Sequence, residues 1–165
     1  MELLGVRLEV QANTPIVLLQ ESEGRRRVLP IYIGNNEAAA IAYALERVVP
    51  PRPLTHDLFR NVLEELGAAL ERVVVTELVE HTFYAELHLQ VAGSPLTVSS
   101  RPSDAIALAV RTGSPIFADE GVLDEAGQEA EVEAAAESGE QEEEILEEFR
   151  DFIERVNPDD FAADQ

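Results

Sequence analysis

The chain has 165 residues, enough for one compact domain with an appendage; 45% of them are hydrophobic, and the formal net charge is −21. Because the sequence contains neither cysteine nor lysine, it excludes disulfides, thiolate metal sites, cysteine nucleophiles and Schiff-base chemistry. No apolar run reaches the length of a membrane-spanning helix and no signal-peptide pattern opens the chain, so we expect a cytoplasmic protein with no membrane partner.

The N-terminal part of the chain predicts strands. Alternation or continuous apolar runs between turn residues indicate three of them, over residues 3–11, 15–20 and 28–33. Pro30 lacks a backbone N–H, which favours an edge position or a bulge for the third strand. Arg25-Arg26-Arg27, before that strand, is the only basic cluster of the sequence. We interpret it as a solvated turn, with phosphate contact as the alternative.

Two helices are expected next. The first covers residues 37–48, where small apolar side chains surround the helix and predict close packing on every side. The proline-rich segment 50–53 then interrupts regular structure. The second helix has Thr55 as its N-cap, keeps one apolar stripe and ends at Gly67.

The chain then returns to strands, which we expect over residues 72–79, 82–91 and 96–99, the first two joined by a hairpin turn at Glu80-His81. A helix from Pro102 to the residue before Gly113 is apolar on all sides and must therefore be buried. Strands, then helices, then strands, without regular alternation, predict an α+β fold. We expect a mixed, largely antiparallel sheet packed with buried helices, plus a C-terminal helical tail.

The C-terminal end differs in charge from the rest of the chain. Residues 1–118 hold 14 acidic and 10 basic side chains, whereas residues 119–165 hold 19 acidic and 2 basic ones. We expect a folded domain over residues 1–127, an acidic flexible linker over 128–144, and a short amphipathic helix and tail over 145–165. With the tail set aside, the objection that an acidic protein repels nucleic acid weakens.

The start of the buried helix is the first candidate site. Arg101, Ser103 and Asp104 lie around Pro102, at a helix N-terminus, where unpaired N–H groups and the helix dipole favour anions. Arg101 and Ser103 are candidates for binding a substrate phosphate, and Asp104 is a candidate catalytic carboxylate. The alternative is structural, with Arg101 and Asp104 forming an ion pair at a buried helix start.

The start of the second helix is another candidate. Arg52, His56 and Asp57 bring a guanidinium, an imidazole and a carboxylate together, a set that suits phosphodiester hydrolysis. In this hypothesis His56 is the catalytic base or acid, Asp57 is a catalytic carboxylate, and Arg52 binds phosphate. The alternative is that Thr55 caps the helix, Asp57 complements its dipole and His56 is solvated.

Three carboxylates, those of Glu37, Asp57 and Asp104, fall in the first turns of predicted helices. If the three helix starts converge, these residues would hold a divalent cation such as Mg²⁺ or Mn²⁺ or position a water molecule. A first-turn carboxylate is also stabilised by about 0.3–1 kcal/mol without any function. The sequence contains no HExxH, phosphate-loop, GxGxxG or GxSxG pattern, which disfavours those reaction classes.

Four segments in order resemble the bifunctional nuclease domain family. They are Leu29 to Gly34 with Glu37-Ala38, Pro51 to Leu58, Thr82 to Ala85, and Ser100 to Ala109. The resemblance covers about residues 1–127, and it implies an α+β fold, assembly into homodimers or larger homo-oligomers, and DNase and RNase activity. The family positions that this chain retains are Glu37, Arg52, Thr55, His56, Asp57, Arg101, Ser103 and Asp104. The chain departs at Arg47 and His81, where the family often has glycine.

Two hypotheses therefore stand. The first is a nuclease that hydrolyses phosphodiester bonds of DNA or RNA, with Glu37 among its catalytic carboxylates beside His56, Asp57 and Asp104. The second is a non-catalytic oligomeric binding or regulatory module, in which the pair of Arg101 and Asp104 is structural. The first requires that the helix starts at residues 55 and 102 lie close together.

Overall fold

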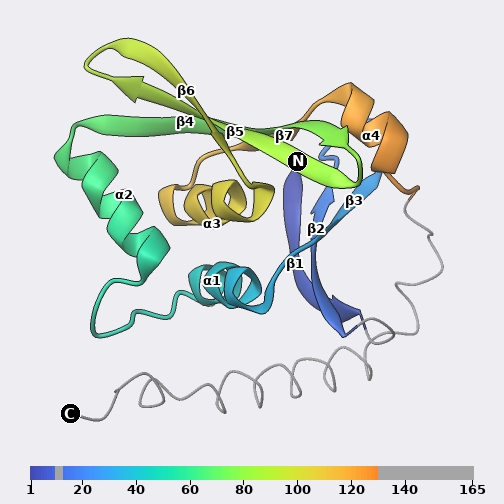
Figure 1. Ribbon diagram of the computed structural model, residues 1–165, viewed down its shortest axis with the longest axis horizontal. Helices are drawn as coiled ribbons and strands as arrows, with labels where there is room; N and C mark the ends of the chain where they lie inside the picture. Colours follow the sequence, from blue (N-terminus) through green and yellow to red (C-terminus); the bar gives the residue numbers. More distant parts are fainter. Residues whose placement is uncertain (10–12, 130–165) are drawn as a thin grey trace. The chain divides into compact units, whose positions relative to one another are not determined.

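The computed structural model describes residues 1–9 and 13–129. The chain forms two compact units, Met1–Ala130 and Glu131–Gln165, and the fold below is that of the first (Figure 1). The predicted linker over 128–144, from residue 130 on, and the predicted helix over 145–165 lie outside the described residues. Within the described part of the chain, no helix combines the length and the apolar character that a membrane crossing requires.

The first unit opens with a three-stranded antiparallel sheet. Its strands β1 (Glu2–Glu9), β2 (Thr14–Gln20) and β3 (Val28–Tyr32) pair in the order β1-β2-β3. Because side chains alternate between the two faces of a strand, β2 and β3 each place every second residue in the core. The buried residues are Pro15, Val17, Leu19, Leu29 and Ile31. β3 is at the edge of this sheet, as predicted from Pro30.

The second sheet has four strands in the order β6-β5-β4-β7. β4 (Ala68–Val79), β5 (Thr82–Val91) and β6 (Ser94–Ser100) pair antiparallel, and β7 (Ile116–Ala118) is parallel to β4. Glu80 and His81 form the predicted hairpin turn with φ of 48° and 65°, a conformation that glycine adopts most easily. The α+β class and the mixed, largely antiparallel pairing are confirmed, with the strands divided between two sheets.

The helix α3 (Pro102–Thr112) lies in the core and packs against α1 (Asn35–Leu45), α2 (Thr55–Glu65), β4 and β5 (Figure 1). Pro102 is its first residue, and Gly113 ends it with a left-handed φ of 71°. Ser103 and every residue from Ala105 to Ala109 are buried. The prediction that this helix is buried is therefore confirmed for most of its length, although Thr112 at its end is exposed.

The helix α2 differs from its prediction at its start and in the direction of its apolar stripe. Its N-cap is Leu54 rather than Thr55, and the Asp57 carboxylate caps the helix by accepting the Leu54 N–H at 3.0 Å. Because α2 packs mainly against α3 and β4, only Leu63 of its apolar residues is buried. The exposed members of the stripe are Leu58, Val62 and Leu66.

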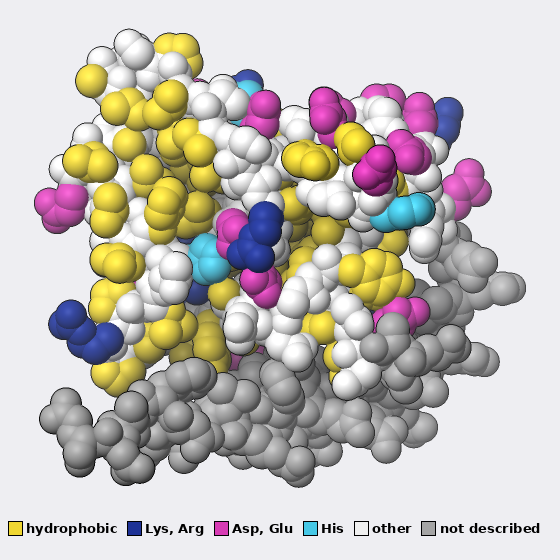
Figure 2. Space-filling view, in the orientation of Figure 1, with side chains coloured by type: hydrophobic (Ala, Val, Ile, Leu, Met, Phe, Trp, Pro, Cys, Tyr) yellow, Lys and Arg dark blue, Asp and Glu magenta, His cyan; other side chains and the backbone are white. Residues whose placement is uncertain are grey.

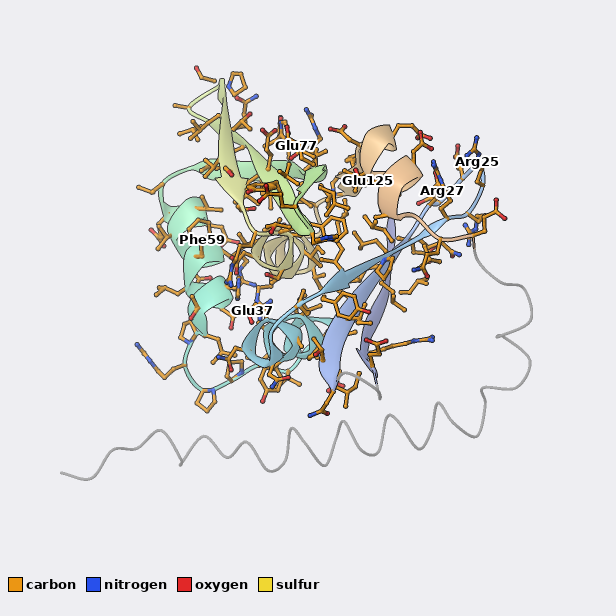
Figure 3. The ribbon with its side chains drawn as sticks, turned by 45° about the vertical axis from the view of Figure 1, so that its right-hand side comes forward. Arg25, Arg27, Glu37, Phe59, Glu77 and Glu125 are labelled. Atoms are coloured by element: carbon orange, nitrogen blue, oxygen red, sulfur yellow. The ribbon has the colours of Figure 1, made fainter. Side chains whose placement is uncertain are left out.

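A buried arginine connects the start of β3 with α4 (Glu120–Ala126), a short helix that was not predicted. The Arg27 side chain donates to Glu21 at 2.8 Å, to Glu120 at 2.7 Å and to Asp124 at 2.8 Å. Its hydrogen bond lowers the pKa of Glu21 to about 2. Figure 3 shows Arg25 and Arg27 beside α4. The interpretation of a solvated basic turn is wrong for Arg27, which is 5% exposed, because three carboxylates pair with its guanidinium.

Candidate active site

Arg101, the N-cap of α3, holds carboxylates from two helices. Its Nε and Nη2 donate to Oδ2 and Oδ1 of Asp104 at 2.8 and 3.1 Å, and its Nη1 donates to Oε1 of Glu37 at 2.9 Å. Asp104 is in the first turn of α3 and Glu37 is in the first turn of α1. Two of the three predicted helix starts therefore meet at one guanidinium group.

His56 joins these residues from the first turn of α2, and its Nε2 lies 3.0 Å from Oδ1 of Asp104. The residues Arg101, Asp104, Glu37 and His56 are called the Arg101 cluster below. The side chains of His56 and Asp104 are 15% and 28% exposed, whereas that of Arg101 is 65% exposed. Figure 2 shows a histidine, an arginine and acidic side chains together near the middle of this face. The cluster is thus held at its base and open to solvent at the guanidinium.

Hydrogen bonds favour the charged forms of Asp104 and Arg101. Burial alone would raise the pKa of Asp104, but hydrogen bonds from Arg101 and then from His56 outweigh it and hold that pKa below its ordinary value. The hydrogen bond to Asp104 in turn raises the pKa of Arg101. Asp104 is therefore an ionised acceptor at neutral pH. A neutral His56 must then carry its proton on Nε2, which leaves the lone pair on Nδ1.

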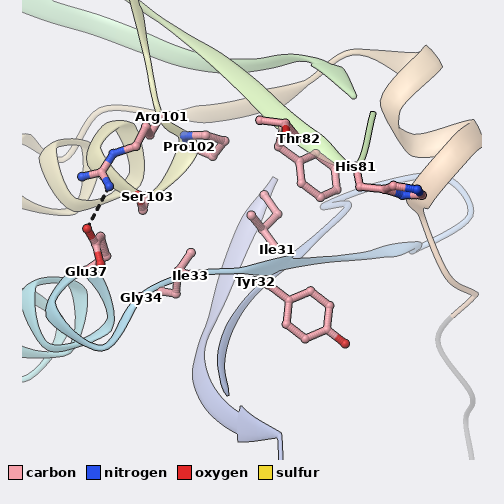
Figure 4. Close-up of a pocket in the computed structure, with 11 residues that line it drawn as sticks. Ile31, Tyr32, Ile33, Gly34, Glu37, His81, Thr82, Arg101, Pro102 and Ser103 are labelled. Carbon is pink, nitrogen blue, oxygen red and sulfur yellow. Dashed lines mark hydrogen bonds and ion pairs between the residues drawn. The ribbon is translucent and has the colours of Figure 1, made fainter. Parts of the chain in front are cut away.

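A pocket of about 370 Å³ opens beside Arg101 (Figure 4). Arg101, Glu37 and the buried Ser103 line one end, and Tyr32 and His81 lie toward the other. Apolar side chains of β3 and β5 complete its wall. This volume is within the usual range for a pocket that takes a small molecule or part of a larger one.

Asp57 faces away from the Arg101 cluster. One carboxylate oxygen accepts the Nε–H of Arg111 at 2.6 Å, and the other accepts the Leu54 N–H. Burial would raise the pKa of Asp57, but these hydrogen bonds hold it below its ordinary value. The Arg111 side chain is 5% exposed, and its role was not predicted from the sequence. Its signal was an arginine that directly follows the apolar run from Ala105 to Val110 in this helix.

The three predicted metal ligands do not all come together. Glu37 and Asp104 meet through Arg101, while Asp57 is engaged elsewhere. In residues 1–9 and 13–129, no three acidic or histidine side chains are arranged to hold a metal ion. Because Mg²⁺ and Mn²⁺ need several oxygen ligands around one point, the three carboxylates do not fit such an ion in this arrangement. Arg52 is exposed in the loop before α2 and does not line the 370 Å³ pocket.

The model of the bifunctional nuclease domain matches residues 17–131, a range that includes the whole Arg101 cluster. The chain belongs to this family. An uncharacterized protein of Mycobacterium tuberculosis is 45% identical to it over 164 residues, which are 97% of this chain and 96% of the relative. Bifunctional nuclease 1 of Oryza sativa subsp. japonica is 29% identical over 114 residues, 67% of this chain and 34% of the plant protein.

Bifunctional nuclease 1 of Arabidopsis thaliana is similar to the same extent, with 29% identity over 115 residues, 68% of this chain and 35% of its own length. The family resemblance of the four segments is confirmed. Because this bifunctional nuclease domain spans about one third of the plant proteins, their activity is transferred to it below only as a proposal.

Proposed function

We propose that this bifunctional nuclease domain hydrolyses phosphodiester bonds of DNA or RNA at the Arg101 cluster. The observation that carries the proposal is the 3.0 Å contact between His56 Nε2 and Asp104 Oδ1, beside an arginine side chain that is 65% exposed. A carboxylate that orients an imidazole supports proton transfer, and an accessible guanidinium stabilises negative charge on a phosphate.

In the proposed reaction His56 acts as the general base. Its Nδ1 accepts a proton from a water molecule, and the oxygen of that water attacks the phosphorus atom. The bond between phosphorus and the leaving oxygen breaks, and the leaving oxygen takes both electrons and then a proton from the imidazolium. Arg101 donates to the non-bridging oxygens as their charge grows, Glu37 holds the guanidinium in place, and the Ser103 hydroxyl lies at the wall where the substrate phosphate would bind.

A divalent cation takes no part in these steps. A cation that is bound by Glu37 and Asp104 would compete with Arg101 for the same carboxylate oxygens. The Arg101 cluster therefore has to supply the base, the orienting carboxylate and the charge stabilisation with its own side chains.

A non-catalytic binding or regulatory module is the second candidate function, with Arg101 and Asp104 as a structural pair. The observation in its favour is that Arg101 bridges α1 and α3 through Glu37 and Asp104. However, an ion pair with an exposed arginine contributes only about 0–1 kcal/mol to stability. The two candidates therefore differ in what the loss of the pair does to folding and to activity.

The test is cleavage of labelled DNA and RNA by the purified chain and by two matched histidine variants. His56→Ala removes the proposed base and should lower the rate by about 10²-fold or more. His88→Ala removes a histidine on β5 that contacts Glu86 and Arg72 rather than the cluster, and it should leave the rate unchanged. Equal cleavage by both variants would indicate a contaminating nuclease and would refute the proposal.

We also propose that copies of this chain associate through the outer face of α2. Leu58, Phe59, Val62 and Leu66 are 55%, 43%, 44% and 70% exposed there. Figure 2 shows hydrophobic side chains gathered on the left of the molecule, where α2 and β6 lie. An apolar surface of this kind indicates an interface, and a two-fold axis would bury the same stripe on both copies. Leu58→Arg should reduce the mass measured by light scattering; an unchanged mass would exclude this face.

A further inference from the structure

A second pocket, of about 530 Å³, adjoins the first turn of α2. Successive residues of a helix point about 100° apart. The His56 side chain therefore points toward Asp104, whereas the Asp57 side chain points toward Arg111 and this second pocket. The end of α1, the loop over residues 48–53 and the end of α3 supply the rest of its lining.

The second pocket concentrates positive charge, although residues 1–118 carry more acidic than basic side chains. Its lining includes three arginines, Arg47, Arg60 and Arg111, against one carboxylate, that of Asp57. Asp57 neutralises Arg111 at 2.6 Å. Arg60 donates to the neutral Asn61 side chain at 2.9 Å, and its own carboxylate partner on α2 is 3.6 Å away. The charge of Arg47 is left without a counterion among the described residues.

Arg47 also has an unusual backbone conformation. Its φ is 55°, in the left-handed region that glycine adopts without strain and that a side chain makes unfavourable. The arginine thus occupies a strained position while its exposed side chain has no hydrogen-bond or ion-pair partner in residues 1–9 and 13–129. The left-handed conformation closes the end of α1, where the N–H groups of Arg47 and Val48 donate to the carbonyls of Ala44 and Tyr43. The unpaired charge of the exposed Arg47 side chain at a pocket points to an anionic ligand.

We propose that the second pocket binds the phosphate group of a nucleotide. Arg47 and Arg60 contact the phosphate oxygens, and the apolar wall formed by the valines and prolines of residues 48–53 accommodates the attached sugar or base. The phosphate belongs either to a nucleic-acid strand or to a free nucleotide, and the chemistry of recognition is the same.

The idea that the phosphate belongs to a nucleic-acid strand rests on the proposed nuclease function. Asp104 and Arg111 are seven residues apart on α3, which corresponds to about 10 Å along the helix axis. A strand that has one phosphate at Arg101 would therefore reach the second pocket within a few nucleotides.

Binding of two probes to the full chain tests this proposal. The probes are a labelled single-stranded oligothymidylate and thymidine monophosphate, and the His56→Ala background prevents cleavage. Arg47→Gln should weaken binding by about tenfold, or about 1.4 kcal/mol, and should reduce the salt slope for the single strand by about 0.7. Arg60→Gln should act in the same direction.

Arg25→Gln is the matched control, because it removes the same charge from a side chain that is 71% exposed near α4. In Figure 3, Arg25 lies on the opposite side of this unit from Phe59 of α2. Weaker binding of both probes to Arg47→Gln identifies a nucleotide pocket, and weaker binding of the oligonucleotide alone identifies a strand subsite. Equal binding by Arg47→Gln and the parent, an equal loss in Arg25→Gln, or no binding of either probe would overturn the proposal.

The outcome is separate from that of the nuclease proposal. If the wild-type chain does not cleave but Arg47→Gln weakens binding, the nuclease proposal fails and the phosphate pocket stands. If cleavage depends on His56 but Arg47→Gln binds both probes as the parent does, the reverse conclusion follows.

Discussion

Asp104→Asn should remove most of the nuclease activity and leave the fold intact. The Asp104 carboxylate accepts two hydrogen bonds from Arg101 and one from His56. An asparagine side chain has one acceptor oxygen and one NH₂ donor, so at least one of the three donors loses its acceptor, and His56 is no longer obliged to protonate on Nε2. We expect the rate to fall by about 10²–10⁴-fold, because proton transfer by His56 depends on that orientation.

The effect on stability follows from the exposure of the same side chains. Because Arg101 is 65% exposed, losing its pair with Asp104 should lower the free energy of unfolding by about 0–1 kcal/mol. Asp57→Asn is the matched comparison. It removes the carboxylate partner of Arg111, whose side chain is 5% exposed, and the loss of a hydrogen bond between charged groups at a buried position costs about 1.5–3 kcal/mol.

Cleavage rates on DNA and RNA, together with denaturant unfolding followed by circular dichroism, separate these effects. Asp104→Asn should lose activity at nearly wild-type stability, and Asp57→Asn should lose more stability while it retains more activity. If Asp104→Asn unfolds at much lower denaturant concentration, the structural-pair hypothesis is supported instead. Wild-type cleavage by Asp104→Asn would refute the role of the carboxylate in orienting His56.

Three further predictions concern charge and strain. The fold should lose stability as the pH falls from 4.5 toward about 2, because Arg27 lowers the pKa of Glu21 over that range and Glu21 stabilises the folded state only while it is ionised. The free energy of unfolding of Glu21→Gln should depend less on pH in that range, and a dependence identical to that of the wild type would contradict the assignment. Arg47→Gly should raise the free energy of unfolding by about 1 kcal/mol, because glycine adopts φ of 55° without strain. A variant that is less stable than the wild type in denaturant unfolding would refute this prediction. Arg101→Gln should bind Mn²⁺ more tightly in calorimetry than the wild type, because it releases two carboxylates; equal affinities would show that these oxygens do not hold the cation.

The parts of the fold that local patterns determine were predicted from the sequence. The alternation in β2 and β3 and the apolar surface of α3 reflect burial of individual elements, and Pro102 and Gly113 determine where α3 begins and ends. The division into two sheets depends on which strands pair, and local periodicity does not contain that information. The helix α4 was missed because the ion pairs of Glu120 and Asp124 with Arg27 connect residues far apart in the chain.

The candidate site was predicted in part for a related reason. The sequence placed His56 and Asp104 at helix starts, and the structure brings them into contact. It did not show that Asp57 turns away, because only one of two successive helix residues can face the same group. Which of them does so depends on the rotation of α2 about its own axis, and packing against α3 and β4 determines that rotation.

The start of α3 is not an anion site by itself, although its sequence has the features of one. Its one guanidinium is already bound by two carboxylates, so the Arg101 cluster carries no excess positive charge while His56 is neutral. Attraction for a polyanion must therefore come from other residues. The second pocket supplies it under the proposal made above, and the buried helix α3 fixes the spacing between the two sites. The salt dependence of nucleic-acid binding should consequently change more in Arg47→Gln than in Arg101→Gln, and cleavage should show the opposite order.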